Sequence, residues 1–217
     1  MTDSRALYII CMENNIVKMR QALAGGFNPN QRLHEDGIKA LHIAAGTGHQ
    51  EMVSLLLQQP DIELNPKTQD SGETPLHLAA VSGHPRVVAL LLQQPGIDTN
   101  AVNPQGWTAL HYAAANGQEE IVALLLDHPG IEAGASDIDG NTALHIAVFG
   151  NAGPGVLRRL LACPTTDPNV KNQAGNTPIM CLLQNGGNQV ERLQAFVECD
   201  KVDLDDQDGR SLEDLAR

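Results

Sequence analysis

Two kinds of apolar run alternate along the chain. The first kind is short and ends in two alanines, and the second contains three consecutive leucines. They stand at 44–45 and 55–57, at 79–80 and 90–92, and at 113–114 and 124–126. A glycine lies between the two runs each time, and glycine readily takes the left-handed conformation that ends a helix. The pattern predicts pairs of helices joined by a tight turn.

The same unit recurs at an almost constant interval. One glycine anchors each copy, and successive anchors are 34 or 35 residues apart: Gly37, Gly72, Gly106, Gly140, Gly175 and Gly209. A period in this range indicates stacked supersecondary units, each of which buries its apolar face against the next. We therefore expect one elongated array and not several globular domains.

Four tetrapeptides in register give this period a family likeness. Thr-Pro-Leu-His stands at 74–77, Thr-Ala-Leu-His at 108–111 and 142–145, and Lys-Ala-Leu-His at 39–42. These motifs at this period resemble the ankyrin repeat. The resemblance implies an all-α solenoid of stacked helix-turn-helix units with β-hairpin loops. It also implies a scaffold that binds proteins and uses no cofactor.

The period divides residues 1–217 into a single domain of repeats. Residues 1–33 keep a helix pair but lack the tetrapeptide, as expected of an N-terminal capping repeat. Five repeats follow, at 34–67, 68–102, 103–136, 137–171 and 172–206. Residues 207–217 open a truncated C-terminal repeat. Either it is a half-repeat cap or the chain is a fragment of a longer protein, and we favour the fragment.

The charge balance argues against nucleic acid as a partner. The chain carries 26 acidic and 14 basic residues and a formal charge of −12, whereas binding to a phosphate backbone needs lysine and arginine. No run approaches the roughly 18 apolar residues of a membrane span, and the first residues lack a signal-peptide pattern. We expect no membrane contact and a monomer in the cytoplasm, with the nucleus as an alternative.

Residues that could carry chemistry form no catalytic or metal-binding motif. Four histidines occupy one position in successive repeats, where the family likeness implies a structural hydrogen bond between repeats: His42, His77, His111 and His145. The others are single residues in loops: His34, His49, His84 and His128. The four cysteines lack metal-ligand spacing and fit a reducing compartment. The sequence predicts no enzyme, no metal and no cofactor.

The family likeness places a partner on the concave side, at the loop tips and the ends of the first helices. The candidate residues there are Ile38, Glu73, Val81, Trp107, Tyr112, Asn116, Ile138, Asp139 and Phe149. Trp107, the one tryptophan, and Phe149 have the profile of binding anchors. The alternatives are that Trp107 packs flat on the adjacent hairpin and that Phe149 folds under its own long turn, 149–155, where a bulge is expected.

Acidic residues surround these candidates and indicate a basic or basic-amphipathic partner segment. They are Glu35, Asp36, Asp70, Glu73, Asp137 and Asp139. The sequence therefore predicts an intracellular protein-binding scaffold. Two narrower readings stay open: an inhibitor of a Rel-type transcription factor, or a targeting or adaptor region of a larger enzyme such as a ubiquitin ligase or a bacterial effector.

Overall fold

The computed structural model describes residues 4–150, 152–184 and 189–203. Its contacts divide the chain into two compact units, Met1–Pro104 and Gln105–Arg217. Both units consist of helix pairs, which confirms the arrangement that the apolar runs predict. The truncated repeat expected at 207–217 lies outside the described residues.

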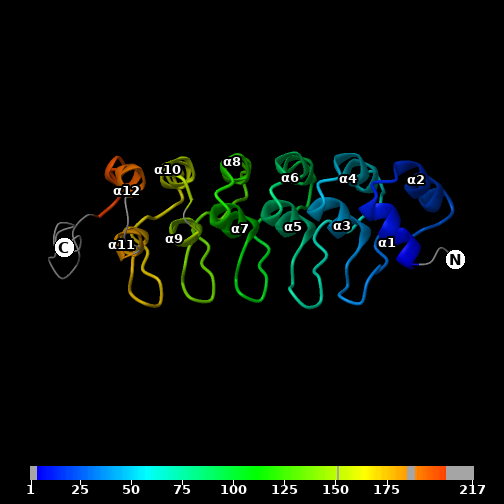
Figure 1. Ribbon diagram of the computed structural model, residues 1–217, viewed down its shortest axis with the longest axis horizontal. Helices are drawn as coiled ribbons and strands as arrows, with labels where there is room; N and C mark the ends of the chain where they lie inside the picture. The colour runs from blue at the N-terminus through cyan, green and yellow to red at the C-terminus, as the bar shows by residue number, and fades with distance from the viewer. Residues whose placement is uncertain (1–3, 151, 185–188, 204–217) are drawn as a thin grey trace. The chain divides into compact units, whose positions relative to one another are not determined.

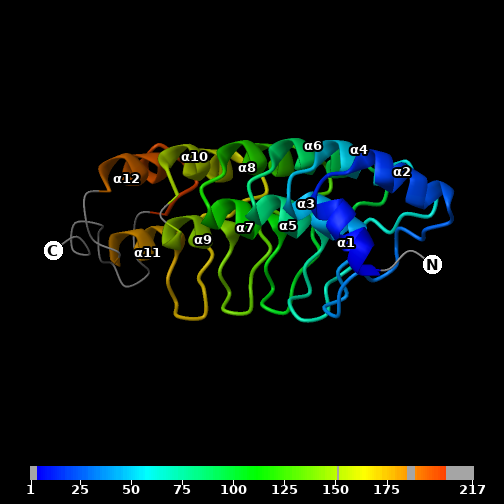
Figure 2. The same ribbon diagram turned by 45° about the vertical axis from the view of Figure 1, so that its right-hand side comes forward.

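Three helix pairs form the first unit, and the N-terminal member of each pair is here named the first helix. The pairs are α1 (Ser4–Met12) with α2 (Ile16–Ala24), α3 (Ala40–Gly46) with α4 (Gln50–Leu57), and α5 (Pro75–Val81) with α6 (Pro85–Leu92). First helices pack on first helices, and second helices pack on second helices. Figures 1 and 2 show α3 beside α5 in one layer and α4 beside α6 in another, with the long loops extending from the layer of first helices.

The second unit repeats this architecture. Its pairs are α7 (Ala109–Ala115) with α8 (Glu119–Leu126), α9 (Ala143–Phe149) with α10 (Pro154–Ala162), and α11 (Pro178–Gln184) with α12 (Val190–Val197). The loops before the first helices carry hairpin-type hydrogen bonds, such as Asp137 N–H to Asn141 O at 2.9 Å. In the part of the chain that the structure describes, they form one isolated bridge, between Ser136 and Thr142, and no full strand.

Small residues at the first-helix interfaces allow neighbouring pairs to approach closely. The alanine pairs 44–45, 79–80 and 113–114 are all 0% exposed. On the second helices, Val53, Val88 and Val122 are also 0% exposed. Since burial of apolar surface is worth roughly 25 cal/mol per Å², this continuous core of aliphatic side chains supplies most of the cohesion within each unit.

In the first four helix pairs, a residue with positive φ ends the turn between the two helices. Gly48, Gly83 and Gly117 have φ of 74°, 74° and 66°, which confirms the predicted helix stops. In the N-terminal pair the same place is taken by Asn14, with φ of 52°. Asparagine is one of the few residues other than glycine that tolerates this conformation.

Threonine and histidine cap one another at the start of a first helix. In α5 the Thr74 N–H donates to His77 Nδ1 (3.1 Å), and the His77 N–H points back at Thr74 Oγ1 (3.4 Å). Thr108 and His111 repeat this exchange in α7. The exchange occupies amides that a helix start leaves without intrahelical partners. Each threonine is thus the N-terminal cap of its helix.

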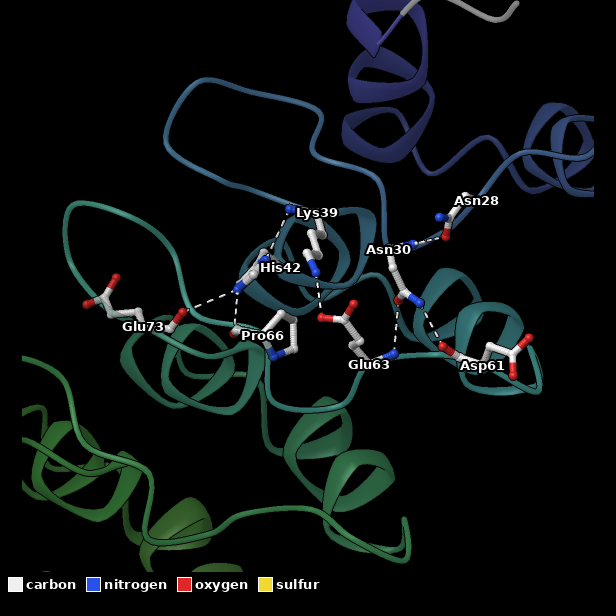
Figure 3. Close-up of polar contacts among 8 residues, drawn as sticks. All are labelled: Asn28, Asn30, Lys39, His42, Asp61, Glu63, Pro66 and Glu73. Carbon is white, nitrogen blue, oxygen red and sulfur yellow. Dashed lines mark hydrogen bonds and ion pairs between the residues drawn. The ribbon is translucent and has the colours of Figure 1, made fainter.

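The other imidazole nitrogen reaches the following repeat. Nε2 of His42 lies 3.2 Å from Glu73 O (Figure 3), Nε2 of His111 lies 3.2 Å from Asn141 O, and Nε2 of His145 lies 3.0 Å from Asn176 O. Because Nδ1 accepts an amide proton, the ring proton is assigned to Nε2, which donates it to the carbonyl. The structural role predicted for this position is confirmed at these three histidines.

Burial favours the neutral form of the His42 and His145 rings. His42 and His145 are 0% exposed, and desolvation lowers the pKa of each below its ordinary value, although the hydrogen bonds to backbone carbonyls act in the opposite direction. A proton on Nδ1 would also face the amide N–H that Nδ1 now accepts. Protonation of the folded protein at this position is therefore unfavourable.

Lys39 stands where the other regular repeats have a threonine, and it stabilises the loop by different contacts. Its N–H donates to His42 Nδ1 (3.1 Å), as a threonine amide would. Its Nζ lies 2.5 Å from Glu63 Oε2, on the loop that follows α4 (Figure 3). The ammonium group is mostly buried and the carboxylate is half exposed, so this ion pair joins two loops of one repeat.

Asparagines in the loops after the second helices form a further link, which the sequence analysis missed. Asn30 Nδ2 donates to Asp61 O (2.6 Å) while Asn30 Oδ1 accepts from Glu63 N–H (2.9 Å), as Figure 3 shows. Asn65 and Asn169 clamp the next loop in the same two-bond way. The equivalent place in the repeat 103–136 holds Gly134, which has no side chain to make the clamp.

Two histidines interpreted as single loop residues in fact join neighbouring helix pairs, so that interpretation was wrong for them. His49 Nδ1 lies 3.0 Å from Cys11 O, and His84 Nε2 lies 3.1 Å from Gly46 O. Each histidine immediately precedes a second helix and reaches the end of the preceding first helix. The signal was present in the sequence, because both stand at the same place in successive repeats.

The first prediction concerns pH. Because the folded pKa of His42 and His145 lies below the unfolded value of about 6.5, the unfolded chain takes up protons first as the pH falls. Their contribution to stability is thus fully present above pH 6.5 and is lost as the pH falls toward the folded pKa. The free energy of unfolding should decrease from pH 7.5 to 5.5, by at most about 1.4 kcal/mol per pH unit for each histidine. Urea denaturation at both pH values measures it, and a constant value would contradict the prediction.

The second prediction is that an asparagine at position 134 adds the clamp that the repeat 103–136 lacks. A Cβ built on Gly134 would lie 3.6 Å from Thr165 O, and its φ is not positive, so an asparagine fits. Gly134→Asn should raise the free energy of unfolding by about 1 kcal/mol, through two added hydrogen bonds. Gly134→Ala is the control for the lower chain entropy of the unfolded state. Equal urea midpoints for the two variants would show that the clamp contributes nothing.

Candidate functional site

Adjacent loop tips of the second unit lie directly against one another. Ile138 N–H donates to Gln105 O at 3.0 Å, and a Cβ built on Gly106 would lie only 2.9 Å from the Cα of Asp137. Gly106 has φ of +78°. A side chain at this position would be both strained and obstructed, so glycine permits the contact. The tip that carries Trp107 therefore neighbours the tip that carries Ile138 and Asp139.

Trp107 packs on its own helix while keeping part of its surface in solvent. Its ring centroid lies 5.0 Å from that of Tyr112 at an interplanar angle of 65°, and 6.2 Å from that of His111 at 28°. Both Trp107 and Tyr112 are half buried. Trp107 thus has a packing role within its own repeat that the sequence interpretation did not assign to it.

Asn116 and Phe149 are brought close by the ends of α7 and α9. A Cβ built on Gly150 would lie 2.2 Å from Ala115 O, so the two backbones nearly touch. Asn116 is exposed and its Nδ2 donates to Tyr112 O (2.9 Å). Phe149 is 49% exposed and does not fold under its turn. The turn to α10 is one residue longer than the turn between α5 and α6.

Arg192 supports the end of α9 and was missed at the sequence level. Although it is only 8% exposed, its Nη2 donates to Val148 O at 2.8 Å and to Ala147 O at 3.4 Å. A positive charge at a helix C-terminus interacts favourably with the carbonyl dipoles. The signal was an arginine at the third position of a second helix, where the other second helices after the N-terminal pair have Met52, Val87, Ile121 or Val156. The contact fixes the backbone that presents Phe149.

The two aspartates of the next loop tip, Asp137 and Asp139, have different roles. Ile138 is 60% exposed and Asp139 is also exposed. The neighbouring Asp137 instead turns its carboxylate into its own loop, where Oδ1 accepts from the N–H groups of Asp139 (3.0 Å) and Asn141 (2.7 Å). Asp137 therefore shapes the loop, and Asp139 is the carboxylate that faces solvent.

Six of the nine candidate residues thus form one connected row in the second unit. They are Trp107, Tyr112, Asn116, Ile138, Asp139 and Phe149, and they lie on the two adjacent loop tips 105–107 and 137–139 and on the adjacent ends of α7 and α9. The other three belong to the first unit and are half buried: Ile38, Glu73 and Val81. Glu73 Oε2 also accepts from Ser71 Oγ at 3.0 Å.

The electrostatic setting of the row is strongly one-sided. No lysine or arginine occurs between Arg86 and Arg158. The same stretch contains seven carboxylates: Asp98, Glu119, Glu120, Asp127, Glu132, Asp137 and Asp139. Positive counter-charge comes instead from side chains such as Arg159, whose Nε lies 3.1 Å from Glu119 Oε1 on the second helices. The stretch of sequence that contains the row therefore carries carboxylates and no lysine or arginine.

The cysteines are the other side chains whose reactivity needs to be considered. Burial raises the pKa of the Cys11 thiol to about 12 and also raises that of Cys181, so both behave as buried apolar groups. Burial acts in the same direction on Cys163, but hydrogen bonds with Thr165 and Thr166 outweigh it and lower its pKa. All four cysteines are free. Within the described ranges no three histidine, cysteine or carboxylate side chains converge on a metal position.

The third prediction separates structural from exposed residues at this row. Gly150→Ala should lower the free energy of unfolding by at least about 2 kcal/mol, since the new methyl group would overlap the Ala115 carbonyl. Phe149→Ala should change it by less than about 1 kcal/mol, because half of the ring is already in water. Thermal or urea denaturation of the two variants measures both effects. A large loss for Phe149→Ala would mean that Phe149 belongs to the core.

Comparison with known proteins agrees with this geometry. None of the helices among the described residues combines the length and apolarity needed to cross a bilayer. A search of curated proteins gave no significant match. A family model described as ankyrin repeats in three copies matches residues 7–103 and again residues 91–172, which is most of the chain. The chain belongs to the ankyrin-repeat family.

Proposed function

We propose that this protein binds a partner protein through the row Trp107, Tyr112, Asn116, Ile138, Asp139 and Phe149 of its second unit. Ankyrin repeats generally mediate protein–protein interactions. The observation that carries the choice of surface is the exposure of two large apolar side chains, Ile138 and Phe149, beside a half-buried aromatic pair. Neither exposed side chain is needed by the core, and both are held by well-supported backbone.

Rigid presentation is the proposed mechanism. The backbone under Ile138 is fixed by Gln105 O, and Gln173 Nε2 donates to Ile138 O at 2.6 Å. The backbone under Phe149 is fixed by Arg192 and by the close approach of Gly150 to Ala115. A surface that is already ordered loses little conformational entropy on docking. A standard interface of about 800 Å² per partner would extend over several repeats.

The partner should carry a basic or basic-amphipathic segment. The row lies in a stretch without lysine or arginine, and Asp139 faces solvent. Complementary charge accelerates association and selects among partners more than it adds affinity. Masking of a Rel-type transcription factor and targeting of a larger enzyme would both use this same surface, so the identity of the partner decides between them. The absence of catalysis and the intracellular location stay predictions.

The fourth prediction tests the surface directly. Affinity capture from lysate with the native chain should recover a partner protein. The double variant Ile138→Ser/Phe149→Ser should recover at least tenfold less of it, because truncating anchor residues commonly costs more than 1 kcal/mol of binding free energy each. Quantitative mass spectrometry of the captured proteins gives the ratio. Trp107→Ala/Phe149→Ala should behave in the same way.

The matched control is Val197→Ser. Val197 is 59% exposed on α12 of the same unit, so the change removes a comparable apolar group at a site outside the row. This variant should keep the partner. If the row variants and the control recover the same proteins equally well, the proposed surface is wrong.

A further inference from the structure

We infer that the Trp107–Tyr112 pair, together with the Asp139 carboxylate, receives an arginine side chain of the partner. This inference rests on the proposed function and names the chemistry of one contact within it. The aromatic pair supplies faces for a planar cation, and the carboxylate supplies the opposite charge. The remainder of the row supplies the apolar contact around them.

The geometry of the pair suits a cation. The rings of Trp107 and Tyr112 meet nearly edge to face, with centroids 5.0 Å apart, so the two planes form a corner and do not stack on each other. Both side chains are half buried, which leaves part of each in solvent. The contact with His111 holds the indole on the helix. An aromatic face attracts a cation placed within about 6 Å of its centroid, and tryptophan does so best.

Asp139 lies on the loop tip next to that of Trp107. Gln105 O accepts from Ile138 N–H, and Gly106 lies against the backbone of Asp137, so the tip with Asp139 adjoins the tip with Trp107. Asp139 is exposed, whereas the side chain of Asp137 is occupied within its own loop. Because no lysine or arginine lies between Arg86 and Arg158, this stretch of sequence supplies no cation to the corner.

Arginine is preferred over lysine for physical reasons. The guanidinium group is planar, stacks on aromatic faces and is less strongly hydrated than an ammonium group. It can also donate two parallel hydrogen bonds to one carboxylate. A lysine would satisfy the charge of Asp139 but would give up a larger hydration shell to contact the rings. Arginine should therefore bind this corner more tightly than lysine.

The experiment uses the fluorescence of Trp107, which is the single tryptophan and so reports on this position alone. The full chain is titrated with N-acetylated, amidated hexa-arginine, hexalysine and hexacitrulline, the last being an uncharged analogue of hexa-arginine. Hexa-arginine should change the emission with saturation, hexalysine should bind more weakly by roughly 2- to 5-fold, and hexacitrulline should have no effect. Raising the salt concentration should weaken the binding of both cationic peptides.

Charge-matched variants separate the corner from the general acidity of the protein. Asp139→Asn should weaken the binding of hexa-arginine roughly 2- to 5-fold more than Asp127→Asn does. Asp127→Asn removes the same charge from the end of α8. Tyr112→Leu keeps the reporter and removes the second ring, and it should weaken binding to a similar degree. Far-UV circular dichroism confirms that each variant is folded.

Two results would overturn the inference. One is peptide binding, measured by anisotropy of a labelled hexa-arginine, without any change in Trp107 emission. The other is equal weakening by Asp139→Asn and Asp127→Asn, which would mean attraction to the whole acidic surface. Failure here is distinct from failure of the proposed function, because loss of the partner in Ile138→Ser/Phe149→Ser does not depend on the aromatic corner.

Discussion

A single imidazole at the start of the first helix links helix formation to the stacking of repeats. In His111 and His145, one ring nitrogen accepts the amide of the helix-capping threonine and the other donates to a carbonyl of the next repeat. Both bonds require the uncharged ring, so the site must stay dry. The alanine pairs and the buried valines exclude the water, and the polar link in turn sets the register in which those apolar groups meet.

The architecture could be predicted because the residues that determine the helices and their ends recur at the repeat period. Helix pairs, their glycine stops and their threonine caps follow from local rules that each repeat obeys independently. The asparagine clamps and the links from His49 and His84 escaped prediction because their partners are backbone groups of a neighbouring repeat, whose positions the sequence does not give. Arg192 escaped for a related reason: only the stack shows that a charged residue at an apolar position finds carbonyl oxygens there.

The surface could be predicted only in part. Ile138, Asp139, Asn116 and Phe149 are exposed as expected, since the repeat register alone places them outside the core. The partial burial of Trp107 was not foreseeable, because it depends on the aromatic ring five residues further along the same repeat, Tyr112, being turned toward it. Ile38, Glu73 and Val81 are half buried, which the repeat register alone does not show.

The long stretch without lysine or arginine has a practical and biological consequence. Trypsin has no cleavage site between Arg86 and Arg158, so even the fully unfolded chain would release residues 87–158 as one fragment. Reagents and enzymes that modify lysine amines have no target in this region either. Acetylation or ubiquitination of a lysine, and labelling with amine-reactive dyes, can mark the flanking repeats while leaving the row from Trp107 to Phe149 unmodified.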